Sequence, residues 1–171
     1  MTKQDEQKQD KQNGRIWGVR TYVATVVFCA AAGLFALSAH AEVAPGDVKF
    51  KDQTVSASLT GKSGNAKSGK KLFIGRKLGN CLACHANKDA SGQQFHGEVG
   101  PALDGVAGRY SEAQLRAIVT NPKMVFGKQT LMPAFYRKAG FVRVRKKFKG
   151  KTILSAQQVE DVIAYLRTLK K

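Results

Sequence analysis

Cys81-Leu82-Ala83-Cys84-His85 forms a C-x-x-C-H motif near the middle of this 171-residue chain. Two thiols three positions apart on one helical turn can each add to a vinyl group of the same porphyrin. The histidine directly after the second cysteine then lies under the iron and can supply one axial nitrogen. This pattern is the attachment sequence of a c-type haem. It predicts one covalent haem c held by Cys81 and Cys84, with His85 as an iron ligand, and so favours a redox carrier or redox subunit.

Two other kinds of site could use the same cysteines. A thioredoxin-type dithiol also has a C-x-x-C pattern, but that motif occurs next to a βαβ unit, whereas the flanking residues here indicate helix and loop. A zinc site could combine both cysteines with His85 and His96. Neighbouring Cys84 and His85 would then have to converge on one small ion, and no second C-x-x-C or H-x-x-x-H pair follows. Covalent haem attachment therefore explains the motif best.

The first 41 residues have the features of a targeting segment rather than of a folded domain. Residues 21–41 contain no Lys, Arg, Asp or Glu, basic residues precede them, and Ala39-His40-Ala41 matches a small-x-small cleavage site. These features predict a secretory signal peptide over residues 1–41. The apolar run is also close to the lower limit for a membrane-spanning helix, so an uncleaved anchor is the alternative. Cleavage after Ala41 predicts a periplasmic protein with no stable membrane anchor.

Size, charge and cysteine content limit what the mature chain can be. Removing 41 of the 171 residues leaves 130, which predicts one domain. These residues hold 24 Lys and Arg against 9 Asp and Glu, a formal charge of +15. Such a balance often indicates nucleic-acid binding, but export excludes that partner and leaves docking to an acidic protein. Only Cys81 and Cys84 remain in the mature chain, so it has no disulfide and no spare thiol for sulfur chemistry.

One stretch carries much of this charge. Residues 137–151 contain eight basic residues and no acidic one. A merely solvated surface is the ordinary explanation for scattered lysines, but it explains this acid-free segment less well.

The pattern of apolar and capping residues predicts a mostly α fold. Residues 42–64 are polar and weakly patterned, and we expect them to form an N-terminal extension that wraps a domain spanning residues 65–171. Ser111 and Ser155 each begin an S-x-x-Q capping box, which marks the start of a helix. The predicted helices are 67–78, 112–120 and 156–169, with a loop at 87–100 and turns at 127–150 that include one short strand, if any, at 142–145.

Three further side chains are candidates for the second axial ligand. His96 follows His85 too closely to reach the opposite face of a porphyrin, so we interpret it as a loop histidine. Met124 lies just past Pro122 near the end of a helix, where core packing is the ordinary role. Met132 precedes Pro133, which restricts its backbone away from helix. Such a loop suits a sulfur held over the iron, so the sequence favours Met132 over Met124, with His/Met ligation raising the potential for electron transfer.

The order of these parts resembles the class I cytochrome c fold over residues 65–171. Gly69-x-x-x-Phe73 resembles the glycine and aromatic pair that lets the terminal helices cross closely, and residues 162–166 resemble the last-helix segment that packs on it, with Tyr165 against Gly69 and Phe73. Gly100-Pro101-x-Leu103 resembles the turn whose proline carbonyl accepts the hydrogen on Nδ1 of the haem histidine. The resemblance thus implies that the Pro101 carbonyl fixes the ring of His85 and its tautomer.

Four longer stretches have a more particular resemblance, to the SoxX family of monohaem cytochromes. These stretches are 78–85, 95–101, 132–136 and 152–162. The resemblance implies a periplasmic heterodimer with a SoxA-like cytochrome subunit, the SoxAX complex (also written SoxXA). It further implies an L-cysteine S-thiosulfotransferase activity, in which the complex joins thiosulfate oxidatively to a cysteine of the carrier protein SoxY. Electrons would leave through the haem to a downstream acceptor, and the sulfur chemistry would lie on the partner subunit.

A second class of function remains open from the sequence. The chain has the features of a free periplasmic electron carrier as well, or of the cytochrome subunit of another dehydrogenase. No sequence feature of the chain itself identifies a partner.

Overall fold

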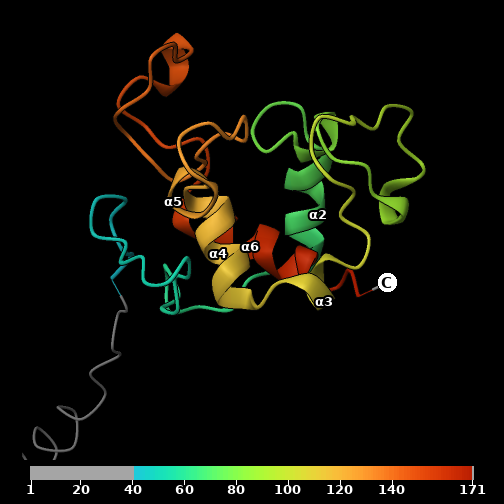
Figure 1. Ribbon diagram of the computed structural model, residues 1–171, viewed down its shortest axis with the longest axis horizontal. Helices are drawn as coiled ribbons and strands as arrows, with labels where there is room; N and C mark the ends of the chain where they lie inside the picture. The colour runs from blue at the N-terminus through green and yellow to red at the C-terminus, as the bar shows by residue number, and fades with distance from the viewer. Residues whose placement is uncertain (1–40, 171) are drawn as a thin grey trace, which may run out of the picture. The chain divides into compact units, whose positions relative to one another are not determined.

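The computed structural model describes residues 41–170, and the predicted signal peptide at 1–41 lies outside that range except for Ala41. The described chain is helical, with no strand and a single isolated bridge between Lys51 and Thr54. Figure 1 labels the α-helices of this range, from α2 to α6. The elements are α2 (Ala66–Ile74), η2 (Cys81–Ala83), η3 (Lys88–Ala90), α3 (Val106–Arg109), α4 (Glu112–Thr120), α5 (Lys123–Phe126), η4 (Lys146–Phe148) and α6 (Ala156–Leu166). The predicted mostly α fold class is confirmed.

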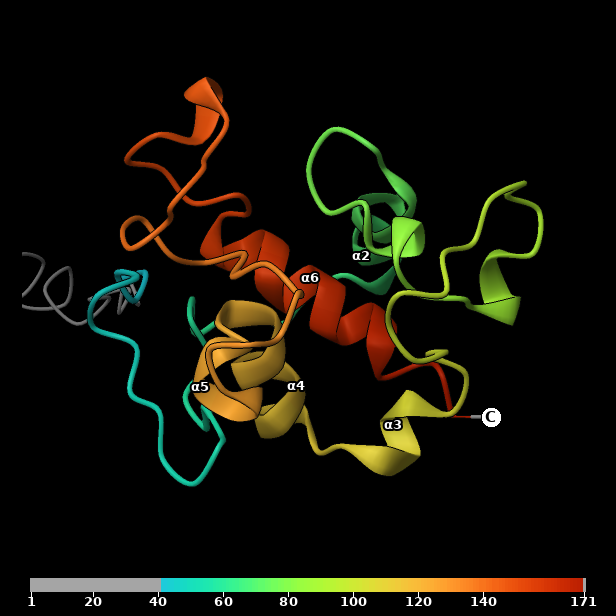
Figure 2. The same ribbon diagram turned by 45° about the horizontal axis from the view of Figure 1, so that its top comes forward.

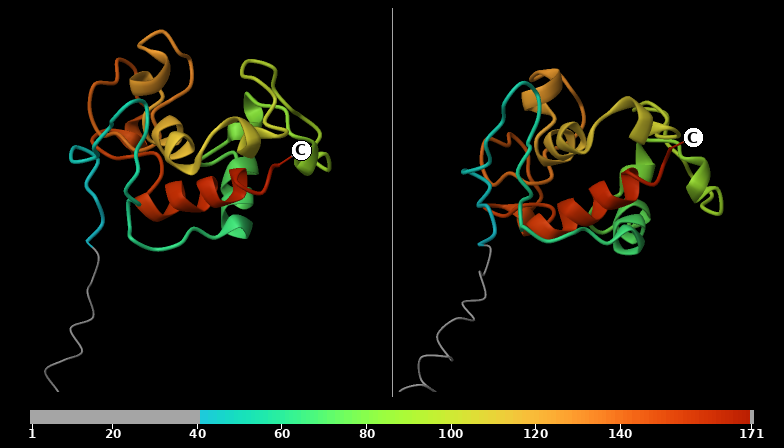
Figure 3. Two further views of the ribbon diagram at one scale, coloured as in Figure 1. Left: turned by 60° about the horizontal axis from the view of Figure 1, so that its bottom comes forward. Right: turned by 90° about the horizontal axis from the view of Figure 1, so that it is seen from below.

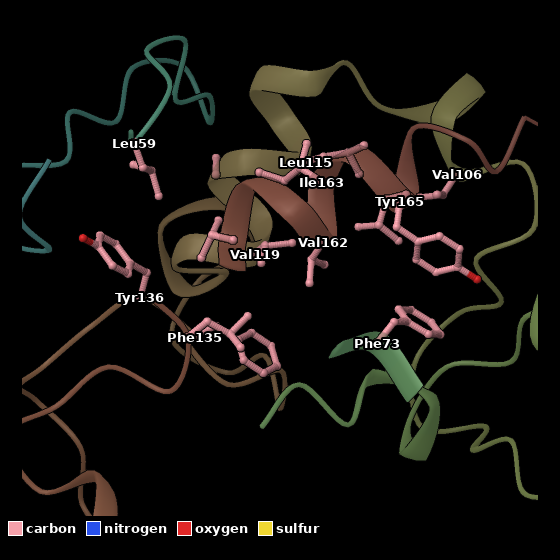
Figure 4. Close-up of a cluster of buried hydrophobic side chains, with 14 of the residues drawn as sticks. Leu59, Phe73, Val106, Leu115, Val119, Phe135, Tyr136, Val162, Ile163 and Tyr165 are labelled. Carbon is pink, nitrogen blue, oxygen red and sulfur yellow. The ribbon is translucent and has the colours of Figure 1, made fainter. Parts of the chain in front are cut away.

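Helix α6 is the centre of the domain, and α2 crosses it closely (Figure 3). A methyl group on Gly69 of α2 would lie 1.9 Å from the carbonyl oxygen of Asp161, so only glycine allows this approach. The rings of Phe73 and Tyr165 meet edge to face with centroids 5.3 Å apart, as the resemblance implied. Figure 4 shows the two rings next to each other, with further apolar side chains of α6 directed at α4 and at Phe135.

The starts of two helices match the sequence prediction, but other boundaries differ. Ser111 and Ser155 form reciprocal capping boxes at α4 and α6. Helix α2 ends at Ile74 rather than near 78, because the chain turns at Gly75 and folds back so that Gly79 lies against the carbonyl of Leu72. Helix α6 ends at Leu166, three residues before the predicted end.

The predicted strand at 142–145 is wrong. Val142 is 99% exposed, and the segment loops away from the domain. Because no strand within residues 41–170 lies beside it, the alternating residues have no partner with which to form a sheet.

Residues 42–64 lie along α4 and α6 (Figure 3). The amide of Val55 donates to the carbonyl of Ala113, and the amide of Leu59 donates to Oε1 of Glu160 at 2.8 Å. Val55 and Leu59 are both buried, so the segment contributes to the core rather than only covering it. At its beginning, the hydroxyl of Tyr136 donates to the carbonyl of Val43 at 2.7 Å.

A buried ion pair joins this segment to the two helices. Nε of Arg116 lies 2.9 Å from Oε1 of Glu160, and both side chains are almost fully buried. Arg116 also donates to the carbonyl of Val55 and to Glu112. Burial alone would lower the pKa of Arg116, but the carboxylates of Glu160 and Glu112 raise it, so the guanidinium remains a cation.

No helix within residues 41–170 has the length and apolar character that a membrane crossing requires.

Candidate haem-binding site

Cys81 begins the short helix η2, which follows the turn at the end of α2, and Cys84 is the residue that caps the end of this helix. Asn80 precedes them in the left-handed region, at φ 49°. The amides of Cys84 and His85 both donate to the carbonyl of Cys81 at 3.0 Å, so the motif closes into one helical turn. The two thiols therefore face a common region from neighbouring positions, as attachment to one porphyrin requires.

The thiols do not have the character of a redox dithiol. Cys81 and Cys84 are free rather than disulfide-bonded, and both are half-buried. Burial raises the pKa of Cys81 to about 12. A thioredoxin-type cysteine needs a lowered pKa, because the thiolate is its nucleophile, so the raised pKa of Cys81 does not favour that alternative.

The His85 imidazole is held in one orientation. Its Nδ1 lies 2.8 Å from the carbonyl oxygen of Pro101, as the resemblance implied. A carbonyl can only accept, so Nδ1 carries the hydrogen and Nε2 keeps its lone pair for a metal. A methyl group on Gly100 would lie 2.3 Å from Cε1 and 2.6 Å from Nδ1 of the ring, so Gly100 allows the turn to pass directly against it.

His96 does not join a metal site with the cysteines. Its Nδ1 accepts the amide hydrogen of Asn87 at 3.2 Å, and its Nε2 then donates to the carbonyl of Ala90 at 3.1 Å. Residues 41–170 contain no cluster of three or more His, Cys, Asp or Glu that could hold a metal ion. His96 is thus a loop histidine, as expected, and the zinc alternative has no support.

A polar network that the sequence did not indicate fixes the loop after His85. Asn87 is 1% exposed, and its Nδ2 donates to the hydroxyl of Tyr165 at 2.8 Å. That hydroxyl donates to Asp89, which is also paired with Lys70 of α2 at 2.9 Å. The hydrogen bond from Lys70, followed by the one from Tyr165, lowers the pKa of Asp89. Tyr165 and Asn87 are 78 residues apart, so no local signal relates them.

The two candidate methionines have different surroundings. Met132 is half-buried and packs against the same hydrophobic cluster as Cys81. Met124 is 55% exposed, so the prediction that it packs in the core is wrong: α5 is only four residues long and turns this side chain outward. Lys123 of α5 instead donates through Nζ to the carbonyls of Thr130 and Met132, the latter at 3.1 Å. This lysine holds the loop that presents Met132, a role that the sequence did not suggest.

These groups fit a covalent c-type haem. The chain presents two free thiols in one turn, an imidazole with its Nε2 available, and a thioether on a separate, anchored loop. Thiols, imidazole and thioether are the groups that attach and ligate haem iron in c-type cytochromes.

Comparisons with known proteins confirm the predicted class I cytochrome c-like fold. A family model described as cytochrome c matches residues 66–170, a range that includes Cys81, Cys84, His85 and Met132. A chain in the crystal structure of SoxXA from P. pantotrophus matches with a TM-score of 0.71 and 46% sequence identity. That match covers 77% of the present chain and 100% of the SoxXA chain. No curated protein matched the chain.

Proposed function

Because this chain belongs to the cytochrome c family and is a SoxX-like electron-transfer cytochrome with a covalently bound haem c, we propose that it serves a thiosulfate-oxidising complex. In this role it is the electron-accepting subunit of a periplasmic heterodimer with a SoxA-like cytochrome. The observation that carries the proposal is the 46% identity to a SoxXA chain over the whole length of that chain.

Four residues have assigned roles in this proposal. Cys81 and Cys84 hold the haem covalently, and His85 and Met132 are its axial ligands. The hydrogen bond from His85 Nδ1 to Pro101 supports the first axial assignment. The half-buried position of Met132, on a loop held by Lys123, supports the second over the exposed Met124.

The reaction of the whole complex requires a division of labour between its subunits. A carrier thiol and thiosulfate join through a new sulfur–sulfur bond, and the reaction releases one proton and two electrons. When bound, the haem supplies a reversible one-electron couple, so two electrons leave this subunit in separate transfers. Both mature cysteines would hold the haem, and His85 and Met132 would ligate its iron. We therefore assign the sulfur chemistry, an L-cysteine S-thiosulfotransferase activity on a SoxY-type carrier, to the partner subunit.

An assay with separated subunits tests this assignment. The haem-loaded mature chain alone should be reduced by small donors but should leave a SoxY-type carrier cysteine unmodified, as followed by mass spectrometry of the carrier. Adding the SoxA-like subunit should restore conjugation of thiosulfate, with reduction of the haem of this chain.

Two results would contradict the proposal in different ways. Full conjugation by the isolated chain would overturn the division of labour. No conjugation by the pair, together with no stable heterodimer, would favour a free electron carrier or a subunit of another dehydrogenase.

A further inference from the structure

The segment 137–151 forms a basic lobe that projects from the domain (Figures 1 and 2). It contains eight Lys and Arg residues without an acid. The three ion pairs among the described residues all lie elsewhere, so no acidic side chain of residues 41–170 forms an ion pair with the lobe. Its charges therefore remain available to an external partner. The basic residues are Arg137, Lys138, Arg143, Arg145, Lys146, Lys147, Lys149 and Lys151.

The lobe lies next to the residues that would hold the haem. Nζ of Lys147 donates to the carbonyl of Lys77 at 3.1 Å. Lys77 and its neighbour Arg76 are exposed and stand a few residues before Cys81, so they add two cations to the same region. At its other end the lobe begins five residues after Met132. The basic surface is thus attached to both chain segments that carry the proposed iron ligands.

The lobe also presents apolar surface among its charges. Val142 is 99% exposed and Val144 is 38% exposed. The two phenylalanine rings of the lobe are covered by its own cations. Lys147 lies 4.5 Å from the ring centre of Phe148, and Arg137 lies 5.2 Å from the ring centre of Phe141. Apolar contact surrounded by charge is the arrangement of a protein-binding site rather than of a surface that attracts only small anions.

We propose that this basic lobe is the docking surface for an acidic, diffusible redox protein that exchanges electrons with the haem. The inference rests on the proposed function and names a partner class for it. A permanent subunit interface is an unsuitable role for the lobe, because lysine is depleted from the cores of such interfaces. Complementary charge chiefly accelerates encounter, which is what a short-lived electron-transfer complex needs.

Two variants with equal charge change test the proposal. The lobe variant carries Arg143→Gln, Arg145→Gln, Lys146→Gln and Lys149→Gln, and it leaves the Lys147 contact intact. The control variant carries Lys49→Gln, Lys51→Gln, Lys62→Gln and Lys67→Gln, all exposed positions outside the lobe. Each variant loses four positive charges, so a difference between them reports position rather than net charge.

The probe is a reduced plant-type ferredoxin, a strongly acidic electron donor of low potential. Stopped-flow reduction of the haem-loaded protein should be about tenfold slower for the lobe variant at low salt, with a shallower salt dependence. The control variant should retain most of the wild-type rate, and neutral hydroquinone should reduce all three proteins equally. Equal slowing of both variants, or none in either, would overturn the proposal.

Assembly with the SoxA-like subunit separates this proposal from the proposed function. The lobe variant should form the heterodimer and support thiosulfate conjugation like the wild type. Loss of the heterodimer in the lobe variant alone would show that the permanent subunit occupies the lobe, contrary to the proposal. Failure of the wild-type pair to conjugate thiosulfate would instead contradict the proposed function and leave the ferredoxin result standing.

Discussion

At the scale of single residues, the His85 ring is defined by what surrounds it. The Pro101 carbonyl assigns its hydrogen to Nδ1, and Gly100 leaves the space in which the ring lies. The Met132 loop is fixed differently: the ammonium group of Lys123 donates hydrogen bonds to two of its backbone carbonyls. Each proposed iron ligand is thus oriented by its own set of backbone contacts.

Replacing Met132 tests the second axial ligand. Met132→Ala should leave an open or water-bound position and lower the potential on the order of 0.1 V, within the range that axial ligands span. Met124→Ala is the matched control and should leave the visible spectrum and the potential almost unchanged. The reverse pattern in spectroscopic titration would assign Met124 as the ligand.

Replacing Gly100 tests the fit around His85. The added methyl group of Gly100→Ala would press on the imidazole, so the ring or the 100–101 turn must shift. We expect a loss of about 1–3 kcal/mol in the free energy of unfolding and an altered haem spectrum. Gly108→Ala, where no heavy atom lies within 4 Å of the added group, is the control; it should leave the haem spectrum unchanged and should not lower the free energy of unfolding. An unchanged spectrum in Gly100→Ala would contradict the tight contact.

At the scale of helices, the contact between α2 and α6 carries a titratable group. Burial, and then the hydrogen bond to Asp89, raises the pKa of Tyr165. Because the folded state favours the neutral phenol, its contribution is complete below pH ~10, the pKa of an exposed tyrosine, and is lost as pH rises through the higher folded value.

Tyr165→Phe should remove this dependence. At neutral pH the variant should be less stable by about 1–3 kcal/mol, since Asn87 loses its hydrogen-bond partner. The difference from wild type should shrink as pH rises above ~10, as measured by thermal unfolding with circular dichroism. Tyr110→Phe is the control, and a constant difference across this pH range would contradict the assignment.

The extension and the two helices that it joins can be tested through the buried ion pair. Glu160→Gln should destabilise the fold by about 3–5 kcal/mol, because the Arg116 guanidinium loses its buried carboxylate. The double variant Arg116→Met with Glu160→Leu should recover part of this loss, since no unpaired charge remains. Chemical denaturation measures both, and limited proteolysis should show earlier cleavage within residues 42–64 in Glu160→Gln. Equal losses in the single and double variants would rule out an unpaired charge as the cause.

Local chemistry explains which elements the sequence could predict. The capping boxes at Ser111 and Ser155 use atoms three residues apart, so the starts of α4 and α6 were predictable. The end of α2, the surroundings of Met124 and the conformation of 142–145 depend on where the chain folds back, so the helix end near 78, the core packing of Met124 and the strand at 142–145 were predicted wrongly. Arg116 with Glu160, and Asn87 with Tyr165, pair across 44 and 78 residues. No local pattern marks such pairs, so these contacts required the structure.

At the scale of the whole molecule, we expect an exported protein that carries one haem. Mass spectrometry of the protein secreted to the periplasm should give a chain that begins at about Glu42 and carries one haem mass. A mass that retains the apolar run of residues 21–41 would support a membrane anchor instead. A mature mass without haem would contradict covalent attachment.

The position of the basic lobe has a consequence for how the molecule can be divided. Its many exposed lysine and arginine residues are natural sites for trypsin, and they lie between the proposed haem ligands and α6. A single cut there would give one fragment that bears the haem and another that consists mainly of α6. The edge-to-face rings of Phe73 and Tyr165, with the close approach at Gly69, would then act as the interface between the two fragments. The lobe is therefore a site at which this cytochrome can be split into complementing halves, with reassembly visible in the colour of the haem.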